Sequence, residues 1–388
     1  FKGPIFCSRG TSELLKILLP DAARLQEEDA DYRNRHNLSK HQPALPLYTE
    51  EDARAALSLM QPVENTGQPT EVAPGMRAGF RIAGHILGSS LVLVQLSGAQ
   101  GLEGRRILFS GDLGHYDQPI IRDPVKPPAC DYLLVESTYG DRLHDPERPA
   151  DALARIINDA ARRNAVVLIP AFAIGRTQEL IYLIRELEDE KRIPVLPVRV
   201  DSPMAAAATQ VYSHRPEEQD EDYASVLARR EHPLRTHAML TTSTREESKR
   251  LNEEQGARII ISASGMMTGG RVLHHARKVL PDEKATILFV GYQAAGTTGR
   301  KILDGEREVK VMGQFTPVRC RVERVGGFSA HADWKEVIRW LEGLKTAPRR
   351  VFITHGEPEA AEAMRGHIIE RFGWTVEVPQ YGETFDLE

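Results

Sequence analysis

The stretch Arg106-Ile-Leu-Phe-Ser-Gly-Asp112-Leu-Gly114 shows the pattern that decides the predicted fold of this chain. A short run typical of a β-strand stops at a glycine that is followed by a carboxylate. A strand-like run ending in a polar residue recurs at Tyr132-Leu-Leu-Val-Glu136, at Val198-Arg-Val-Asp201 and at Val351-Phe-Ile-Thr-His355. Because ligands gather at the carboxyl ends of strands in open α/β sheets, these polar residues are the first candidates for a functional site.

Short β-rich runs alternate with helical patterns from Gly104 onward, which predicts an α/β fold. The β-rich runs are Arg106 to Ser110, Tyr132 to Val135, Val166 to Ile169, Val198 to Val200, Arg258 to Ile261, Thr286 to Val290 and Val351 to Thr354. Apolar residues between the runs keep the spacing of one helix face, as at Leu153, Ile156, Ile157 and Ala160. The segment from about Leu143 to Lys301 is long enough to be a domain, so we expect one domain inserted into another.

The composition is that of an ordinary globular protein, with 41% hydrophobic and 27% charged residues among 388. It excludes collagen-like, mostly disordered and multi-span membrane classes. The longest apolar run, around Val166 to Ile174, is broken by Pro170 and is too short for a membrane helix. The net charge of −5 means that a polyanionic partner requires positive charge concentrated in a groove. Three cysteines without a CxxC pair argue against a disulfide framework and a thiolate zinc site, so a reducing cytoplasm is the expected compartment.

Three histidines and one aspartate lie in glycine-bearing loops after or near predicted strands: His85, Asp112, His331 and His355. Each has a structural alternative when taken alone. A histidine beside a glycine is commonly a turn or core residue, and an aspartate such as Asp112 or Asp333 can cap the turn or helix that follows it. Together, three histidines and a carboxylate supply the ligands and proton-transfer groups of a hydrolytic metal site.

Five segments occur in an order that resembles the motif series of the β-CASP branch of the metallo-β-lactamase fold. They are Gly84-His-Ile-Leu-Gly-Ser-Ser90, Ser110-Gly-Asp-Leu-Gly114, Val135-Glu-Ser-Thr-Tyr-Gly-Asp-Arg142, Gly326-Gly-Phe-Ser-Ala-His-Ala-Asp333 and Thr354-His-Gly-Glu357. The resemblance extends to Pro170-Ala-Phe-Ala-Ile-Gly-Arg176, Asp201-Ser-Pro-Met204 and Ser262-Ala-Ser-Gly-Met-Met267. It implies an α/β fold with an N-terminally incomplete αββα sandwich at residues 1–142 and 302–388. The second of these parts would carry a C-terminal RNA-metabolising motif, and a β-CASP domain at 143–301 would be inserted between the two.

The resemblance also implies roles for the candidate residues. His85 looks like a ligand of a first zinc, Asp112 like the carboxylate that bridges two zinc ions, and His355 like a ligand of the second. Glu136 looks like the carboxylate that pairs with His331, and His331 like the group that orients the scissile phosphate or protonates the leaving oxygen. Asp112, Glu136 and His331 are therefore the expected catalytic residues, and two Zn²⁺ ions the expected cofactor.

Single-stranded RNA is the substrate that the resemblance implies, because family members acting on RNA usually carry histidine where His355 stands. The residues expected to face RNA phosphates at a cleft between the domains are Arg176, Ser264, Gly265, Arg271 and Ser329. The alternative for these residues is helix capping and surface solvation. The implied function is a zinc-dependent ribonuclease, with endonuclease and 5′-3′ exonuclease modes both open and a homodimer as one option for assembly. Rival functions are a non-catalytic RNA-processing subunit, a small-molecule metallo-hydrolase of the same superfamily and a DNA nuclease, which His355 disfavours.

One part of the family pattern is absent from this sequence: the His-x-His-x-Asp-His run upstream of a segment like Phe1 to Asp21. On the implied roles, each zinc then has two protein ligands at most, with Asp112 shared, whereas hydrolytic zinc sites commonly use three. We therefore expect this chain alone to bind metal poorly and to have little activity. Because Phe1 is not methionine and the downstream motifs are intact, a sequence that begins partway into a longer protein is favoured over a degenerate scaffold or RNA-binding relative.

Overall fold

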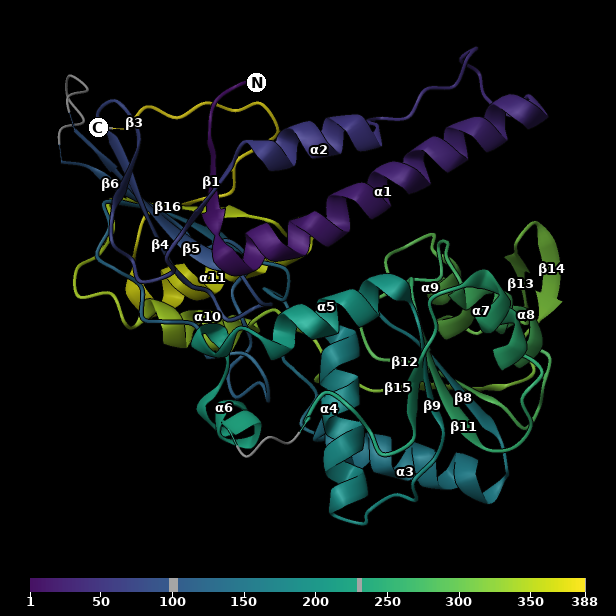
Figure 1. The fold of residues 1–388 in the computed structure, drawn as a ribbon. Coiled ribbons are helices and arrows are strands. Elements are labelled where there is room, and N and C mark those ends of the chain that lie inside the picture. The colour runs from purple at the N-terminus through teal and green to yellow at the C-terminus, as the bar shows by residue number, and fades with distance from the viewer. Residues whose placement is uncertain (98–103, 229–231, 388) are drawn as a thin grey trace. The chain divides into compact units, whose positions relative to one another are not determined.

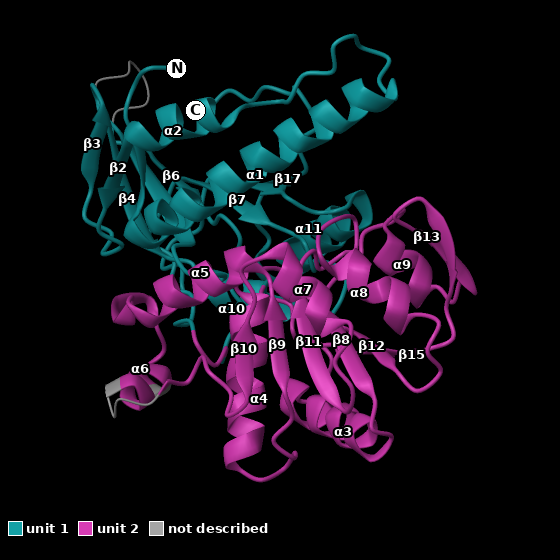
Figure 2. Cartoon of the chain, turned by 45° about the vertical axis from the view of Figure 1, so that its right-hand side comes forward, with its two compact units in different colours: residues 1–117, 121–143, 331–388 teal, residues 118–120, 144–330 magenta. Residues whose placement is uncertain are grey.

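The computed structural model describes residues 1–97, 104–228 and 232–387. The chain divides into two compact units (Figure 2): unit 1 comprises residues 1–117, 121–143 and 331–388, and unit 2 comprises residues 118–120 and 144–330. The segments of unit 2 thus lie between segments of unit 1 in the sequence. The domain boundaries expected from the sequence, 142/143 and 301/302, stay a prediction. The long segment of unit 2 begins after residue 143 and ends at residue 330.

Unit 1 is built on a seven-stranded sheet of order β17-β16-β7-β6-β5-β4-β3. Strands β3, β4, β5, β6 and β16 are labelled in Figure 1. Its strands are β3 (Thr70–Ala73), β4 (Met76–Ile82), β5 (Ser90–Leu96), β6 (Arg106–Phe109), β7 (Tyr132–Glu136), β16 (Arg350–Thr354) and β17 (Val376–Glu377). The four strands from β17 to β6 are parallel, and β6, β5, β4 and β3 pair in antiparallel fashion. A separate parallel pair joins β1 (Ile5–Ser8) to β2 (Met60–Val63). The helices are α1 (Arg9–His36), α2 (Glu50–Ser58), α10 (Trp334–Leu341) and α11 (Pro358–Phe372).

Helix α10 shows how the sequence positions the elements around the candidate site. Asp333 accepts a hydrogen bond from the backbone N–H of Glu336, and Glu336 accepts one from the backbone N–H of Asp333, both at 3.0 Å. This capping box satisfies two donors at the helix start, so the N-cap alternative for Asp333 is confirmed. The helix then buries Val337, Ile338, Trp340 and Leu341 in a core shared with α11 and the sheet. Burial of each such side chain stabilises the fold by about 1.5–3 kcal/mol.

Unit 2 is built on a six-stranded, fully parallel sheet of order β10-β9-β11-β8-β12-β15. Its strands are β8 (Val166–Pro170), β9 (Val198–Asp201), β10 (Met239–Thr241), β11 (Arg258–Ser262), β12 (Thr286–Phe289) and β15 (Arg321–Arg324). Every residue of β11 and β12 is buried, as is typical of parallel strands covered on both faces. β13 (Glu308–Val311) and β14 (Gln314–Pro317) form a separate hairpin. The helices are α3 (Pro149–Arg162), α4 (Arg176–Asp189), α5 (Pro203–Ser213), α6 (Glu221–Ala228), α7 (Arg245–Leu251), α8 (Val272–Val279) and α9 (Thr298–Leu303), with a 3₁₀ turn at Pro216–Glu218.

The structure confirms the predicted α/β class, because each predicted β-rich run is a strand of one of the two sheets. Strand β15 follows residue 301, yet it pairs with β12 in the sheet of unit 2. Among the described helices, none combines the length and the apolar character needed to cross a membrane.

Candidate active site

Four of the sequence-predicted residues meet at one edge of the sheet of unit 1. β16, β7 and β6 are parallel, so their carboxyl ends share that edge, and Asp112, Glu136 and His355 lie there. β5 is antiparallel to β6 and β4 is antiparallel to β5, so the loop that joins β4 to β5 reaches the same edge. That loop carries His85. The predicted clustering at strand ends thus follows from the strand directions.

Close backbone approach fixes the loop that carries His85. The backbone N–H of Gly114 donates to the carbonyl of Ala83 at 2.8 Å, and the hydroxyl of Ser89 accepts from the backbone N–H of His85 at 3.0 Å. A Cβ at position 114 would lie 2.0 Å from the carbonyl oxygen of Gly84, so only glycine fits there. The absence of a side chain at Gly114 lets the loops of His85 and Asp112 touch.

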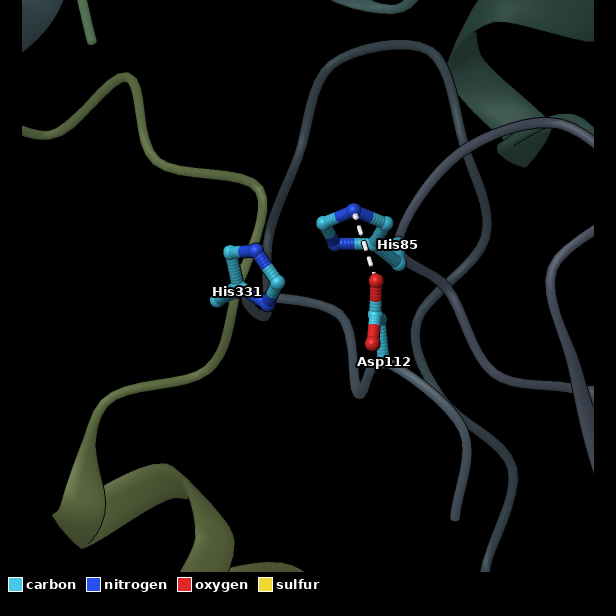
Figure 3. A group of neighbouring side chains, drawn as sticks. All are labelled: His85, Asp112 and His331. Atoms are coloured by element: carbon cyan, nitrogen blue, oxygen red, sulfur yellow. Dashed lines mark ion pairs between the residues drawn. The ribbon is translucent and has the colours of Figure 1, made fainter. Parts of the chain in front are cut away.

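Asp112 lies between two histidines and presents a different oxygen to each. Its Oδ2 is 3.8 Å from Nε2 of His85, and its Oδ1 is 3.3 Å from Nδ1 of His355. Figure 3 shows the carboxylate below the ring of His85, with His331 beside them. The rings of His85 and His331 have centroids 4.3 Å apart, and those of His331 and His355 have centroids 5.8 Å apart. One carboxylate therefore joins the predicted ligands into a single group.

The second carboxylate, Glu136, is buried and bonded to His331. Both of its oxygens lie 3.1 Å from Nδ1 of His331, and Oε1 also accepts from the backbone N–H of Leu113 at 2.5 Å. Burial alone would raise the pKa of Glu136, but the hydrogen bond and charge of His331, with contributions from Thr138 and His85, hold that pKa below its usual range. Glu136 is thus an ionised carboxylate that orients the ring of His331.

His331 is held by its own backbone as well as by Glu136. It forms a bridge with Gly114, and the next residue, Ala332, donates its N–H to the carbonyl of Leu113 at 2.8 Å. Asp333 then begins α10. The segment from Gly326 to Asp333 therefore delivers the imidazole to the site and continues directly into a buried helix.

His355 occupies a left-handed backbone conformation with φ 52°, which is uncommon for a residue other than glycine. The hydroxyl of Thr138 donates to the carbonyl of His355 at 3.1 Å and also lies 3.2 Å from its Nδ1. At the next residue, a Cβ on Gly356 would lie 2.3 Å from the hydroxyl oxygen of Ser137. The Ser-Thr pair after β7 therefore holds His355 against Asp112.

The donor set fits a divalent cation of the zinc type. Imidazole nitrogens and carboxylate oxygens are zinc ligands, and two ligands at about 2.0–2.1 Å from a tetrahedral ion lie roughly 3.4 Å apart. The two Asp112–histidine separations, 3.3 and 3.8 Å, are close to that spacing. One ligand atom from each of His85, Asp112 and His331 lies within 4.8 Å of the others, as do ligand atoms of Glu136, His331 and His355. With His331 bonded to Glu136, Asp112 and His85 offer two protein ligands for one ion, and Asp112 and His355 offer two for another. A third ligand for each ion must come from elsewhere.

The two arginines predicted to face RNA both bind carboxylates within unit 2. Arg176 begins α4, forms an ion pair with Glu179 and packs against the ring of Phe328 with its guanidinium carbon 5.3 Å from the centroid. Nη1 of Arg271 donates to Oδ1 of the fully buried Asp201 at 2.8 Å. Their guanidinium groups are therefore held in place from within the unit.

The other predicted RNA contacts lie in loops of unit 2. Ser264 and Gly265 follow β11, where the hydroxyl of Ser264 accepts from the backbone N–H of Thr268 at 3.1 Å. The carbonyl of Gly265 accepts from the amide of Gln293 at 3.0 Å. Ser329 is half-buried in the segment that follows β15. The loops of Ser264, Gly265, Arg176 and Arg271 share the carboxyl edge of the six-stranded sheet, because its strands are parallel.

Two domain families match parts of this chain. The Beta-Casp domain family matches residues 177–302, and the Zn-dependent metallo-hydrolase RNA specificity domain matches residues 316–379. Ribonuclease TTHA0252 of Thermus thermophilus is 33% identical over 384 residues, which are 99% of this chain and 82% of that ribonuclease. The chain belongs to the β-CASP family of metallo-β-lactamase-fold ribonucleases.

Archaeal proteins are similar to this β-CASP chain as well. The transcription termination factor FttA of Methanocaldococcus jannaschii is 28% identical over 367 residues, covering 92% of this chain and 55% of the factor. FttA of Pyrococcus abyssi is 29% identical over 407 aligned positions, covering 100% of this chain and 58% of the factor. The chain thus spans little more than half the length of these archaeal relatives. Membership of the β-CASP family confirms the metallo-β-lactamase fold with its insertion, and the metal-dependent hydrolase class that the motifs predicted.

Sequence reasoning missed two sets of contacts that support residues of the β-CASP chain. Thr138 donates a hydrogen bond to the carbonyl of His355, and only its position two residues after Glu136 could have signalled this contact. Asp201 was noted as a strand-end residue, but its buried bonds to His275 and Arg271 join residues some 70 positions apart and leave no local signal. His275 is fully buried, so its bond to Asp201 lies inside the unit.

Proposed function

We propose that this β-CASP chain binds single-stranded RNA and hydrolyses its phosphodiester bonds with the help of two zinc ions. The observation that carries the proposal is the placement of Asp112, which turns one oxygen to His85 and the other to His355 beside the buried Glu136–His331 pair. RNA is the proposed substrate because the similar proteins are named a ribonuclease and transcription termination factors. The histidine at position 355 supports the same choice.

Two sub-sites would hold the metal. His85 and Oδ2 of Asp112 would bind the first zinc, and His355 and Oδ1 of Asp112 the second. Bound zinc supplies a water of lowered pKa and positive charge against the phosphate oxygens. Asp112 is negatively charged when it binds, so it offsets part of the mutual repulsion of two cations.

Two residues of this chain would hold and transfer the proton that the leaving oxygen needs. Glu136 accepts from Nδ1 of His331, which fixes the orientation of that ring and places the exchangeable proton of the imidazolium on Nε2. The buried negative charge of Glu136 favours the protonated form of His331. His331 can then donate its Nε2 proton to the departing oxygen of the RNA as a general acid.

The RNA itself would be bound through unit 2. Arg176, Ser264, Gly265, Arg271 and Ser329 are the proposed contacts to its phosphates. Arg271 fits this role as a cation of fixed position, because the bond to Asp201 orders its guanidinium group before RNA arrives. A preordered guanidinium loses little conformational entropy when a phosphate binds.

The proposal includes a low activity for the chain as printed. Each proposed zinc sub-site has two protein ligands, of which Asp112 is shared, and the printed sequence contains no His-x-His-x-Asp-His run. With fewer ligands than the three that hydrolytic zinc sites commonly use, zinc would bind weakly and cleavage would be slow.

The test uses the 388-residue chain and an end-labelled single-stranded RNA. We expect RNA binding in the presence of a chelator, slow cleavage that rises with zinc concentration, and loss of that cleavage in His331→Gln. A chain that binds the RNA equally with and without zinc and never cleaves it would be a non-catalytic RNA-binding subunit. A chain that does not bind RNA at all would contradict the proposed substrate. Robust cleavage at low zinc that His355→Ala abolishes would contradict the ligand count.

A further inference from the structure

One exposed aromatic ring lies at the carboxyl edge of the sheet of unit 2. Phe172 follows β8, and 47% of its surface is exposed. Other large apolar side chains are exposed in the described part of unit 2, namely Val195, Leu240, Met312, Phe315 and Val322. Of this set, Phe172 alone lies in a loop that leaves the carboxyl end of a strand of the six-stranded sheet. That edge is where ligands bind in parallel sheets.

The backbone around Phe172 is fixed from within. The carbonyl of Phe172 accepts two hydrogen bonds from Thr177, one from its backbone N–H at 3.2 Å and one from its hydroxyl at 2.8 Å. Its neighbours Ala171 and Ala173 are buried, with 1% and 8% of their surfaces exposed. The backbone N–H of Ala171 donates to the carbonyl of Ser262 at 3.0 Å. Buried neighbours on both sides hold the ring of Phe172 outward in an ordered segment.

A glycine leaves room beside the ring. Gly265 does not have a positive φ, so its backbone does not require glycine. A Cβ at this position would lie 3.1 Å from the backbone nitrogen of Phe172 and 3.3 Å from Cδ2 of its ring. These contacts are tighter than ordinary van der Waals spacing. The glycine therefore lets the loop of Ser264 approach the aromatic ring closely.

We propose that Phe172 is a stacking platform for a base of single-stranded RNA, next to the loop of Ser264 and Gly265. This inference rests on the proposed function, in which that loop and Arg271 contact phosphate. Single strands are commonly bound by aromatic rings that stack on bases, beside polar and basic groups that bind the backbone. An outward-facing ring beside groups that are proposed to bind phosphate has both features. Stacking is tolerant of base identity, so Phe172 contributes affinity rather than sequence specificity.

The experiment measures the affinity of the 388-residue chain for a labelled single-stranded oligoribonucleotide by fluorescence anisotropy, in chelator and at one fixed salt concentration. Phe172→Ala is expected to weaken binding by about 5- to 150-fold, the range found when a base-stacking aromatic is replaced by alanine. Phe172→Leu keeps an apolar side chain without a ring face and is expected to weaken binding as well. Phe172→Trp keeps a ring face and is expected to retain the affinity. The matched control is Phe315→Ala, which removes an exposed phenylalanine from the β14 hairpin of the same unit and is expected to change nothing.

A second probe separates stacking from damage to the fold. An oligonucleotide of equal length made of abasic ribose phosphates offers the same backbone without bases. Wild-type chain and Phe172→Ala are expected to bind it equally, because there is no base to stack. The proposal is overturned if Phe172→Ala binds the RNA as tightly as the wild type, or if it loses as much affinity for the abasic strand as for RNA. If the wild-type chain binds no RNA, the proposed function fails and this inference fails with it; if the wild type binds and Phe172 does not matter, this inference alone fails.

Discussion

Replacement of Asp201 by asparagine should destabilise unit 2 strongly, although the side chain keeps its size. Asp201 ends β9, is fully buried, and receives hydrogen bonds from four side chains. They come from His275 at 2.6 Å, Ser248 at 2.5 Å, Arg271 at 2.8 Å and Thr242. The donors belong to α7, α8 and the segment that follows β10, so one carboxylate ties three parts of the chain to the sheet.

The magnitude follows from the number of these bonds that an amide can keep. Removing one partner of a buried charge pair costs about 3–5 kcal/mol. The carbonyl oxygen of an asparagine can still accept from Arg271 and Thr242, whereas its amide nitrogen would face the donors His275 and Ser248. We therefore expect the free energy of unfolding to fall by about 3 kcal/mol for Asp201→Asn, and by nearer 5 kcal/mol for Asp201→Ala.

Urea unfolding followed by far-ultraviolet circular dichroism measures the loss of stability. Hydrogen-exchange mass spectrometry shows which segments of the chain are destabilised. Exchange should accelerate in the peptides of α7 and α8. The matched control is Asp304→Asn, because Asp304 also pairs with an arginine, Arg300, but in an exposed pair on α9. Such pairs contribute about 0.3–0.5 kcal/mol. Equal small effects of the two substitutions would refute the assignment of Asp201 as the buried anchor.

The effect of Asp201→Asn should also depend on pH. Burial alone would raise the pKa of Asp201, but hydrogen bonds from His275, Ser248, Thr242 and Arg271 hold it far below its usual range. A carboxyl group with a depressed pKa in the folded state stabilises the fold fully above its unfolded pKa, near 3.9, and loses that contribution as the pH falls below it. The stability difference between wild type and Asp201→Asn should therefore be constant at neutral pH and shrink below about pH 4.

Three further predictions test other parts of the structure. Gly114→Ala should lower the free energy of unfolding by about 1–3 kcal/mol, because its Cβ would lie 2.0 Å from the carbonyl oxygen of Gly84. Gly366→Ala, in open space on α11, should raise the free energy of unfolding by about 0.5–1 kcal/mol. Urea titrations of the two variants measure both changes. Glu136→Gln should slow zinc-dependent RNA cleavage by about 10²-fold or more and leave RNA affinity in chelator unchanged. An unaltered rate would show that the Glu136 carboxylate does not assist general-acid catalysis by its histidine partner. The three buried cysteine thiols should react with a thiol reagent only after unfolding, since burial raises their pKa values, that of Cys130 to about 12; rapid labelling of the native chain would contradict this.

Much of the fold was predictable because strands such as β7, β9 and β16 are short, mostly buried and followed by a polar residue. The long helix α1 was not predicted over its whole length. It runs from Arg9 to His36 and contains Pro20, and few of its residues are buried. The stretch from Gln26 to Pro46 is polar, and such a composition fits a connection as well as a loosely packed helix. In the structure the helix continues to His36, and Asn37 ends it in the left-handed backbone conformation.

The candidate site was predictable to the extent that its residues sit in recognisable loops. His85, Asp112, Glu136, His331 and His355 were expected together, and strand direction explains why they meet. The sequence pointed to Arg176 and Arg271 as candidates, but it did not show that each binds a carboxylate. Glu179 stands three residues after Arg176, a helical spacing that could have signalled their ion pair. Asp201 is 70 residues from Arg271 in sequence, so only the structure reveals that bond.

The central claim is that Asp112 joins His85 and His355 into a metal-binding group. Zinc affinity of the full chain, measured by competition with a chromophoric chelator, tests it most directly. His85→Ala and His355→Ala should each weaken zinc binding by more than about 10-fold, because even loss of a residue behind a metal ligand costs that much. Asp112→Ala should cost more than either, since it contacts both histidines, whereas His36→Ala, on the exposed end of α1, should change nothing. Zinc affinities for the Asp112, His85 and His355 variants equal to that of the wild type would contradict the account.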